Sequence, residues 1–379
     1  MKSSINKKPT KKLKAAFIIF FFILSFQTNL SGTPKNEHLD LGNSSAASIQ
    51  CVWKGIEKIV AVGDIHGDYD NFVTILKATG IIDEALHWKA GKTHFVQIGD
   101  IMDRGNDAKK VFDLMMRLEK EAEQTGGKVH MLIGNHEEMN ITGVAFRRIG
   151  YVTPKQFASF LPEKYREKKE KEFKKKMEKS VQEGTNSDPS LDISLDKCWD
   201  DLKKREGAQK LYTNTFNENY GKWIIKHNAV IKINDIVFVH GGISERFSTK
   251  KLEDINNKLR EELNIYRIAY KRSQIAIIKP EILYVSDGPL WFRDLAQKDE
   301  ETYKEDVVRI LKNLDAKHMV IAHTPRIGSK VVASEEEMSR FEGKIWIIDT
   351  GISEYYGGSL SALIIEKGKF SVWGKIDEE

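Results

Sequence analysis

KIVAVGDIHG, residues 58–67, is the stretch that decides the fold class of this chain. Residues 58–62 have the β-branched, apolar character of a buried strand, and the strand ends in a Gly-Asp pair. The segment 69–79 then places apolar side chains at helical spacing and stops at a glycine, so it predicts a helix. A strand that ends in polar residues and leads into a helix begins an α/β unit.

The same order repeats further along the chain. A predicted strand over 94–98 ends at Asp100, a helix follows over 107–124, and a third strand over 128–133 ends at Asn135. This alternation of strands and helices predicts an α/β fold. In such folds ligands gather at the carboxyl ends of the strands, which is where all of these polar residues lie.

The later sequence predicts further strands and one long helix. Two apolar runs separated by Asn234-Asp235 predict a hairpin that ends at His240. A helix is expected over 248–275. The remaining predicted strands are 318–322, 344–349, 359–366 and 369–373.

Residues 151–222 differ from the rest in composition. This stretch is dense in lysine and glutamate and poor in apolar residues, with both charge signs mixed. We interpret it as a solvated, charged helical insertion. The alternative is a cap that lies over the site and influences substrate choice, because insertions beside strand ends are well placed for that.

The polar residues at the strand ends are of the types that bind a pair of divalent ions. Asp64 and His66 are two residues apart, so on an extended strand they point to the same side and can bind one metal. Asp100 has two oxygens and can bridge two ions. The full set of candidate metal ligands is Asp64, His66, Asp100, Asn135, His240 and His323. Such a pair activates water, and we expect the resulting hydroxide to attack phosphorus directly.

Neighbouring residues supply the other roles of a phosphoester hydrolase. His136 is the candidate general acid for the leaving oxygen, Asp103 its orienting carboxylate, and Arg104 a planar fork for phosphate oxygens. Glu137 is expected to brace the loop. For His323 alone, a packed, hydrogen-bonded core histidine remains an alternative. Asp349 is left unassigned, as a supporting residue or a turn former.

Most of the basic excess of the chain lies at its N-terminus. The formal net charge is +5, but residues 1–31 contain six lysines and no acidic residue. The remainder is close to neutral and lacks the basic face that nucleic-acid binding needs. We therefore expect no nucleic-acid partner.

Residues 1–31 also have the pattern of a secretory signal peptide. Basic residues precede an uncharged run over 15–26, which is shorter than the ~20 residues of a membrane-spanning helix. This predicts export, to a periplasm or out of the cell, with cleavage within 27–33 and no stable membrane contact afterwards. The alternative is an uncleaved N-terminal anchor. Residues 32–55 are predicted to be a linker or loose arm.

Two cysteines, Cys51 and Cys198, are too few for a disulfide framework. One bridge and two free thiols both remain open.

Four motifs together resemble the PPP family of calcineurin-like metallophosphoesterases: GDIHG (63–67), GDIMDRG (99–105), GNHE (134–137) and HGG (240–242). The runs FVHGGIS (238–244), PLWFR (289–293) and IAHTP (321–325) are similar to the Shewanella-like, bacterial-type branch. The resemblance implies a central β-sandwich of mixed sheets flanked by helices, in a metallophosphoesterase domain over 56–379. It also implies a dinuclear site between the sheets and a preference for phosphotyrosine.

The chain departs from the eukaryotic members of the family in its phosphate-binding arginines. Leu132-Ile133 stands where those enzymes have an arginine before Gly134, which fits the bacterial-type branch. Arg293 is the candidate for the second phosphate-binding arginine, with a surface ion pair as its alternative role.

The sequence thus favours a metallophosphatase acting on a phosphorylated protein or peptide. A hydrolase of dinucleoside polyphosphates or small phosphoesters is the alternative, and a non-catalytic metal-binding or scaffold protein is the third. Oxygen and nitrogen ligands suit Mn²⁺, which we expect, and also Fe, Zn, Co or Ni.

Overall fold

The computed structural model describes residues 49–148, 150–183, 195–272, 279–326 and 334–374. Within them the strands form two mixed sheets. The six-stranded sheet has the order β1 (Val52–Trp53), β5 (Val230–Ile233), β6 (Ile236–Val239), β7 (His318–Ile321), β9 (Ile345–Ile347) and β8 (Ser339–Arg340). The five-stranded sheet has the order β11 (Lys369–Gly374), β10 (Ser361–Glu366), β2 (Lys58–Val62), β3 (His94–Gln97) and β4 (Lys128–Met131).

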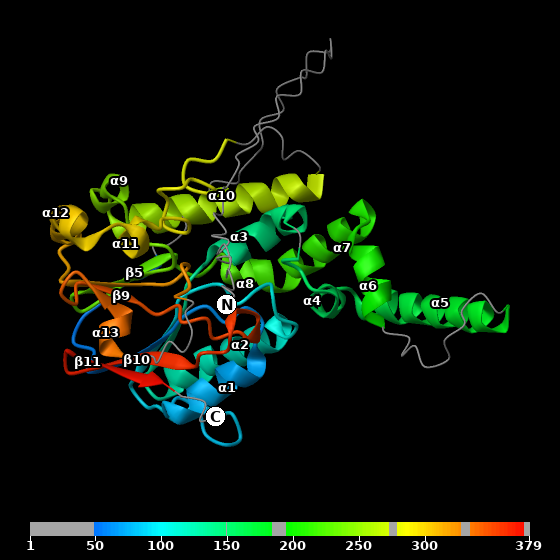
Figure 1. The fold of residues 1–379 in the computed structure, drawn as a ribbon, viewed down its shortest axis with the longest axis horizontal. Coiled ribbons are helices and arrows are strands. Elements are labelled where there is room, and N and C mark those ends of the chain that lie inside the picture. The colour runs from blue at the N-terminus through cyan, green and yellow to red at the C-terminus, as the bar shows by residue number, and fades with distance from the viewer. Residues whose placement is uncertain (1–48, 149, 184–194, 273–278, 327–333, 375–379) are drawn as a thin grey trace, which may run out of the picture. The chain divides into compact units, whose positions relative to one another are not determined.

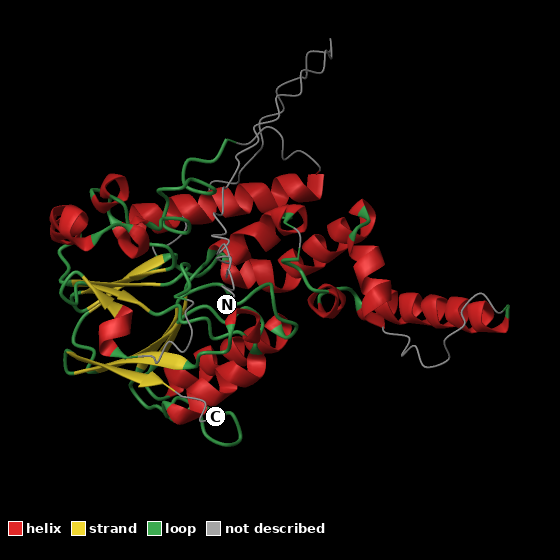
Figure 2. Ribbon diagram, in the orientation of Figure 1, coloured by secondary structure: helices red, strands yellow, loops and turns green. Residues whose placement is uncertain are grey.

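Helices flank both sheets. Figure 1 shows α1 and α2 beside the five-stranded sheet and α9 to α12 beside the six-stranded one, and Figure 2 shows the strands in two layers between them. The α-helices are α1 (Tyr69–Ala78), α2 (Ala108–Gln124), α3 (Asn135–Thr142), α4 (Pro154–Ser159), α5 (Glu163–Gln182), α6 (Leu195–Lys203), α7 (Glu206–Phe216), α8 (Lys222–Ile224), α9 (Glu245–Ser248), α10 (Leu252–Arg272), α11 (Asp294–Gln297), α12 (Glu300–Asn313) and α13 (Glu335–Met338). Shorter 3₁₀ or π turns are η1 (Val144–Arg147), η2 (Asn217–Gly221) and η4 (Glu354–Tyr356). This confirms the predicted α/β architecture of mixed sheets flanked by helices.

Parallel pairing brings the strand ends together. In the five-stranded sheet β2, β3 and β4 run parallel, and in the six-stranded sheet β6, β7 and β9 do. Strands with both faces covered read as continuous apolar runs, which is why these strands are recognisable in the sequence. Their carboxyl ends lead into the polar motifs.

Most predicted elements are present with shifts of one to four residues at their ends. The helix expected over 107–124 begins at Ala108, with Asp107 at its N-terminal cap position but forming no side-chain hydrogen bond there. The helix expected over 248–275 is α10, Leu252–Arg272. The hairpin around Asn234-Asp235 is β5 and β6, paired antiparallel.

The loose arm predicted over 32–55 ends earlier than expected. Val52 and Trp53 form β1, which pairs in parallel with β5. The Trp53 indole lies against His130, with ring centroids 4.5 Å apart, and Cys51 is buried. These contacts join residues distant in the sequence, so no local pattern could reveal them. Residues 32–48 lie outside the described residues, as does the predicted signal peptide over 1–31.

The predicted insertion over 151–222 is helical where it is described, but it is not solvated throughout. Helix α5 is mostly exposed, as its charge pattern suggested. In contrast, α4 and α7 place Phe157, Tyr212 and Phe216 in the core with no exposed area. Phe157 and Tyr212 stack with ring centroids 5.5 Å apart. The interpretation as a purely solvated insertion is therefore wrong for these two helices, since their apolar residues are too widely spaced to stand out among the charges.

Both cysteines are free and buried, so the disulfide alternative is not observed. Among the described helices, none has the length and apolar character to cross a bilayer.

Candidate metal centre

The candidate ligands come from both sheets. Asp64 follows β2 and Asp100 follows β3. Asn135 is the first residue of α3, after the short connection that follows β4. From the six-stranded sheet, His240 follows β6 and His323 follows β7. Each of these side chains is at most 5% exposed, so the structure brings the predicted ligands together in a buried cluster.

The backbone at His66 is not extended, although the sequence predicted that it would be. Its φ of 46° is left-handed, so the backbone is a turn there and not an extended strand. The same region of φ recurs at Asp100 (58°) and His323 (64°). Non-glycine residues rarely adopt it, and such strain concentrates at functional sites.

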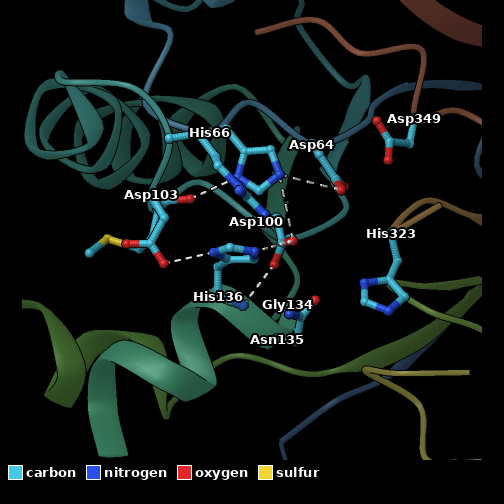
Figure 3. Close-up of polar contacts among 12 residues, drawn as sticks. Asp64, His66, Asp100, Asp103, Gly134, Asn135, His136, His323 and Asp349 are labelled. Carbon is cyan, nitrogen blue, oxygen red and sulfur yellow. Dashed lines mark hydrogen bonds and ion pairs between the residues drawn. The ribbon is translucent and has the colours of Figure 1, made fainter. Parts of the chain in front are cut away.

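Asp100 lies at the centre of the cluster. Its Oδ2 is 3.9 Å from His66 Nε2, 3.8 Å from His136 Nε2 and 3.3 Å from His240 Nε2. Figure 3 shows the His66 and His136 rings turned toward the Asp100 carboxylate. Two groups could each hold a metal ion, namely His66, Asp100 and His136, and Asp100, His240 and His323. Because Asp100 belongs to both, the geometry suits two neighbouring ions that share one carboxylate.

Two orphaned atoms show that the cluster fits a cation. Asp64 Oδ1 and His323 Nε2 are buried and have no hydrogen-bond partner among the described residues. An unpartnered buried polar atom is costly, and a metal ion would supply the missing partner for both. Burial and the Asp349 and Asp100 carboxylates raise the pKa of Asp64 well above its usual range. A cation would relieve this crowding of acids.

The histidines of the cluster differ in protonation. Burial lowers the pKa of His66 to about 4 and that of His323 well below its ordinary value, which favours the neutral imidazoles that metals bind. For His136, burial opposes the charge, but Asp100 and Asp103 outweigh it and raise the pKa. Although His136 can reach one candidate ion, its protonation suits a proton donor better than a ligand.

Hydrogen bonds to surrounding groups fix the orientation of the side chains in the cluster. His66 Nδ1 lies 2.9 Å from the Met102 carbonyl oxygen and His240 Nδ1 lies 3.1 Å from that of Ile98. Such contacts fix the ring and tautomer of a metal-binding histidine. Glu137 accepts from four backbone N–H groups, those of Asp100, Ile101, Met102 and Gly134, at 2.8 to 3.2 Å. This confirms that Glu137 braces the loop.

Asp103 and His136 form the predicted pair. His136 Nδ1 is 2.7 Å from Asp103 Oδ2, and both side chains are buried. Arg104 lies next to three aromatic rings, with its guanidinium carbon 4.0 Å from the Tyr151 centroid, 4.9 Å from that of Tyr355 and 5.7 Å from that of Tyr356. Its Nη1 donates to the Tyr355 hydroxyl at 3.2 Å.

Arg293 is not in a surface ion pair with any described residue. Its Nη1 donates to the His323 carbonyl at 2.7 Å and to Thr324 Oγ1 at 3.0 Å. It therefore fixes the loop that carries His323.

Asp349, which the sequence left unassigned, lies in the cluster, where burial raises its pKa to about 6. Other residues of the site were not singled out from the sequence. Glu138 accepts from Tyr284 N and from Trp291 Nε1, and the Trp291 ring lies 5.7 Å from that of His323. Asn140 contacts Asp103 and stands one helical turn after His136, so its spacing was a usable signal.

Comparison with known proteins defines the class. Residues 57–341 match the model of the calcineurin-like phosphoesterase family, and the chain belongs to that family. It is therefore a metal-dependent phosphoesterase.

Relatives define the branch. The chain is 31% identical to an uncharacterized protein of Schizosaccharomyces pombe, over 82% of this chain and 77% of that protein. It is 28% identical to Shewanella-like protein phosphatase 1 of Plasmodium berghei, over 79% of this chain and 68% of the relative. The crystal structure of a cold-active protein-tyrosine phosphatase from a psychrophilic Shewanella superposes with a TM-score of 0.59 at 27% identity, covering 84% of this chain and 78% of that one. The chain is a metallophosphatase of the Shewanella-like protein phosphatase branch.

Proposed function

We propose that this chain is a protein phosphatase with a preference for phosphotyrosine, acting through a two-metal centre. The observation that carries the proposal is the Asp100 carboxylate shared by two candidate metal-binding groups. The ligands would be Asp64, His66, Asp100, Asn135, His240 and His323. Two divalent ions bound there supply Lewis-acid polarisation of phosphoryl oxygens and activation of water. Mn²⁺ suits this donor set, as do Fe, Zn, Co and Ni.

The protein's own groups then bind the phosphate and protonate the leaving oxygen. His136, fixed by Asp103 through Nδ1, has Nε2 available to donate a proton. Arg104 is positioned to bind phosphate oxygens, and its buried Nε has no partner among the described residues. Arg293 supports the phosphate through the nitrogens that do not contact the His323 loop.

The aromatic rim supports the tyrosine preference. We use this name for Tyr151, Tyr355 and Tyr356, which surround Arg104. The Tyr355 side chain is 57% exposed, an unusual position for a large ring. A ring at this place can stack on the aryl group of phosphotyrosine, whereas phosphoserine offers none. The Shewanella relative, described as a protein-tyrosine phosphatase, supports the same preference.

Phosphate release tests the function. Purified protein would be stripped with a chelator, reloaded with Mn²⁺ and assayed on matched phosphotyrosine and phosphoserine peptides. We expect turnover that depends on metal and is faster on phosphotyrosine. Faster turnover of phosphoserine contradicts the preference but not the phosphatase. Absence of turnover on both, with metal bound, contradicts the proposed function and favours nucleotide or small phosphoester substrates.

The aromatic rim gives a first specific prediction. Tyr355→Ala should lower the ratio of kcat/KM for phosphotyrosine over phosphoserine by roughly three- to tenfold, the worth of one aromatic contact. Tyr355→Phe should preserve the ratio, because it keeps the ring and removes the hydroxyl. Val308→Ala, at a side chain that is 51% exposed on α12, serves as the control. An unchanged ratio in Tyr355→Ala would show that the aromatic rim does not determine the phosphotyrosine preference.

We also propose export, on the basis of the lysine cluster and short apolar run in residues 1–31. N-terminal sequencing of the mature protein tests it, and a first residue within 27–34 is expected. An intact Met1 on membrane-bound protein would instead support the N-terminal anchor.

A further inference from the structure

The Asp103 carboxylate is surrounded by side chains that donate to it. Besides His136, Asn140 Nδ2 lies 3.1 Å from Oδ1 and 3.0 Å from Oδ2, and Gln156 Nε2 donates to Oδ1 at 2.8 Å. The backbone N–H of Asp103 donates in turn to Gln156 Oε1 at 2.8 Å. Gln156 therefore contacts both the backbone and the carboxylate of Asp103, a residue whose own φ of 70° is left-handed.

Tyr212 closes this network. Its hydroxyl accepts from Gln156 Nε2 at 3.1 Å and donates to Asn140 Oδ1 at 2.8 Å. The three side chains of Asn140, Gln156 and Tyr212 have no exposed area. They come from α3, α4 and α7, so two of the three helices belong to the stretch over 151–222.

The hydrogen count gives the network a direction. The single hydroxyl hydrogen of Tyr212 goes to Asn140, so the Tyr212 oxygen must accept from Gln156. Both amide groups then present their hydrogens to Asp103 and its neighbours. With N–H donors on both oxygens, Asp103 acts as an acceptor and takes a hydrogen bond from His136 Nδ1. The opposite ring nitrogen, Nε2, is then directed to the Asp100 side of the site, 3.8 Å from Asp100 Oδ2.

We propose that Gln156 and Tyr212 are positioning residues for the general acid, so that α4 and α7 are a functional part of the site. The proposal rests on the proposed function. Neither side chain reaches the candidate metal cluster, and each acts on His136 through Asp103. A fixed carboxylate orients the imidazole, and orientation of a proton donor matters most when the leaving group is poor.

A structural role alone predicts something different. If Gln156 and Tyr212 only stabilise the core, their variants lose activity on all substrates in proportion to unfolded protein. If they position the acid, the loss depends on the leaving group, because a good leaving group departs with little help from a proton.

The test compares two aryl phosphates. Gln156→Ala and Tyr212→Phe would be assayed on p-nitrophenyl phosphate, with a good leaving group, and on phenyl phosphate, with a poor one. We expect kcat on phenyl phosphate to fall roughly tenfold or more, part of the 10²–10⁴ that a general acid contributes, with a clearly smaller fall on p-nitrophenyl phosphate. The metal content per chain should stay at the wild-type value.

The controls separate the possible failures. Lys155→Ala changes an exposed neighbour on the same helix and should match the wild type on both substrates. Tyr212→Phe removes one oxygen, so it keeps the test decisive if Gln156→Ala does not fold. An equal loss on both esters, a loss that follows metal content, or no loss in either variant overturns the positioning role while the phosphatase stands. A wild type that hydrolyses neither ester overturns the proposed function and the positioning role together.

Discussion

At the scale of single residues, the proposed site separates metal binding from proton donation within one cluster. His66 and His323 have lowered pKa values, whereas that of His136 is raised. All three are buried, so burial alone does not distinguish them. Asp100 lies at a similar distance from His66 (3.9 Å) and from His136 (3.8 Å), so the difference is Asp103, whose carboxylate lies 2.7 Å from His136 Nδ1. Identical imidazoles would therefore take different roles in the proposed reaction because of their acidic neighbours.

This division predicts the behaviour of Asp103→Asn. The amide cannot accept from His136 as the carboxylate does, so kcat should fall roughly 10²- to 10⁴-fold, the usual contribution of a general acid. Metal content should be unchanged, because Asp103 is outside the candidate ligand set. Metal analysis and kcat measured on the same sample check this. Equal loss of metal and activity would show that Asp103 does not act through His136.

At the scale of elements, strand ends were predictable and long-range braces were not. The motifs after β2, β3 and β6 could be recognised because each follows a buried apolar run. Gln156 and Tyr212 had no such signal, because what matters is the contact of Gln156 with Asp103, 53 residues away, and the contact of Tyr212 with Gln156. The same applies to β1, whose partner strand is distant in the sequence. From the sequence alone, a glutamine in a charged stretch is expected to be exposed, and only the fold shows that Gln156 is buried.

Glu137, in α3, holds the loop that follows β3, and this contact gives a stability prediction. Glu137 accepts from four backbone N–H groups, and Glu137→Gln would place an amide NH₂ against some of these donors. We expect a loss of about 1–3 kcal/mol in the free energy of unfolding, since the amide nitrogen cannot accept and leaves buried donors without a partner. Urea unfolding of metal-free protein measures it. Glu163→Gln, at the exposed start of α5, is the control. A loss below about 0.5 kcal/mol, the usual range of surface substitutions, would contradict the brace.

The His94–His130 pair in β3 and β4 gives an acid-sensitivity prediction. Burial lowers the pKa of His94 to about 4 and that of His130 well below its usual value. The unfolded chain binds these protons near pH 6.5, so it holds more protons than the folded chain between pH 6.5 and 4. Stability must therefore fall as the pH falls through this window, by up to about 1.4 kcal/mol per pH unit for each group.

Urea unfolding of metal-free protein at pH 7, 6, 5 and 4 measures this slope. His130→Gln keeps a polar partner for His94 and removes one buried titrating group, so its slope should be smaller than that of the wild type. His87→Gln, at a side chain that is 57% exposed, should retain the wild-type slope. Identical slopes in wild type and His130→Gln would show that folding does not lower the pKa of His130.

At the scale of the whole domain, the candidate ligands join two sheets. Asp64 and Asp100 follow strands of the five-stranded sheet, and His240 and His323 follow strands of the six-stranded sheet. A metal pair that shares Asp100 would connect the two. Since the unfolded chain has no such site, binding would stabilise the fold by mass action. Without metal, the buried acids of the cluster oppose one another, as the raised pKa of Asp64 shows.

This predicts a metal-dependent stability that Asp100 controls. With Mn²⁺ at about a hundred times its dissociation constant, the wild type should gain roughly 3 kcal/mol in free energy of unfolding and a higher Tm. Asp100→Asn removes the shared carboxylate charge and should lose most of this gain. Thermal unfolding with and without Mn²⁺ checks both statements. Lys155→Ala should gain as much as the wild type. If Asp100→Asn gained the full amount, the ions would not share Asp100, and the two-metal centre would lose its main structural support.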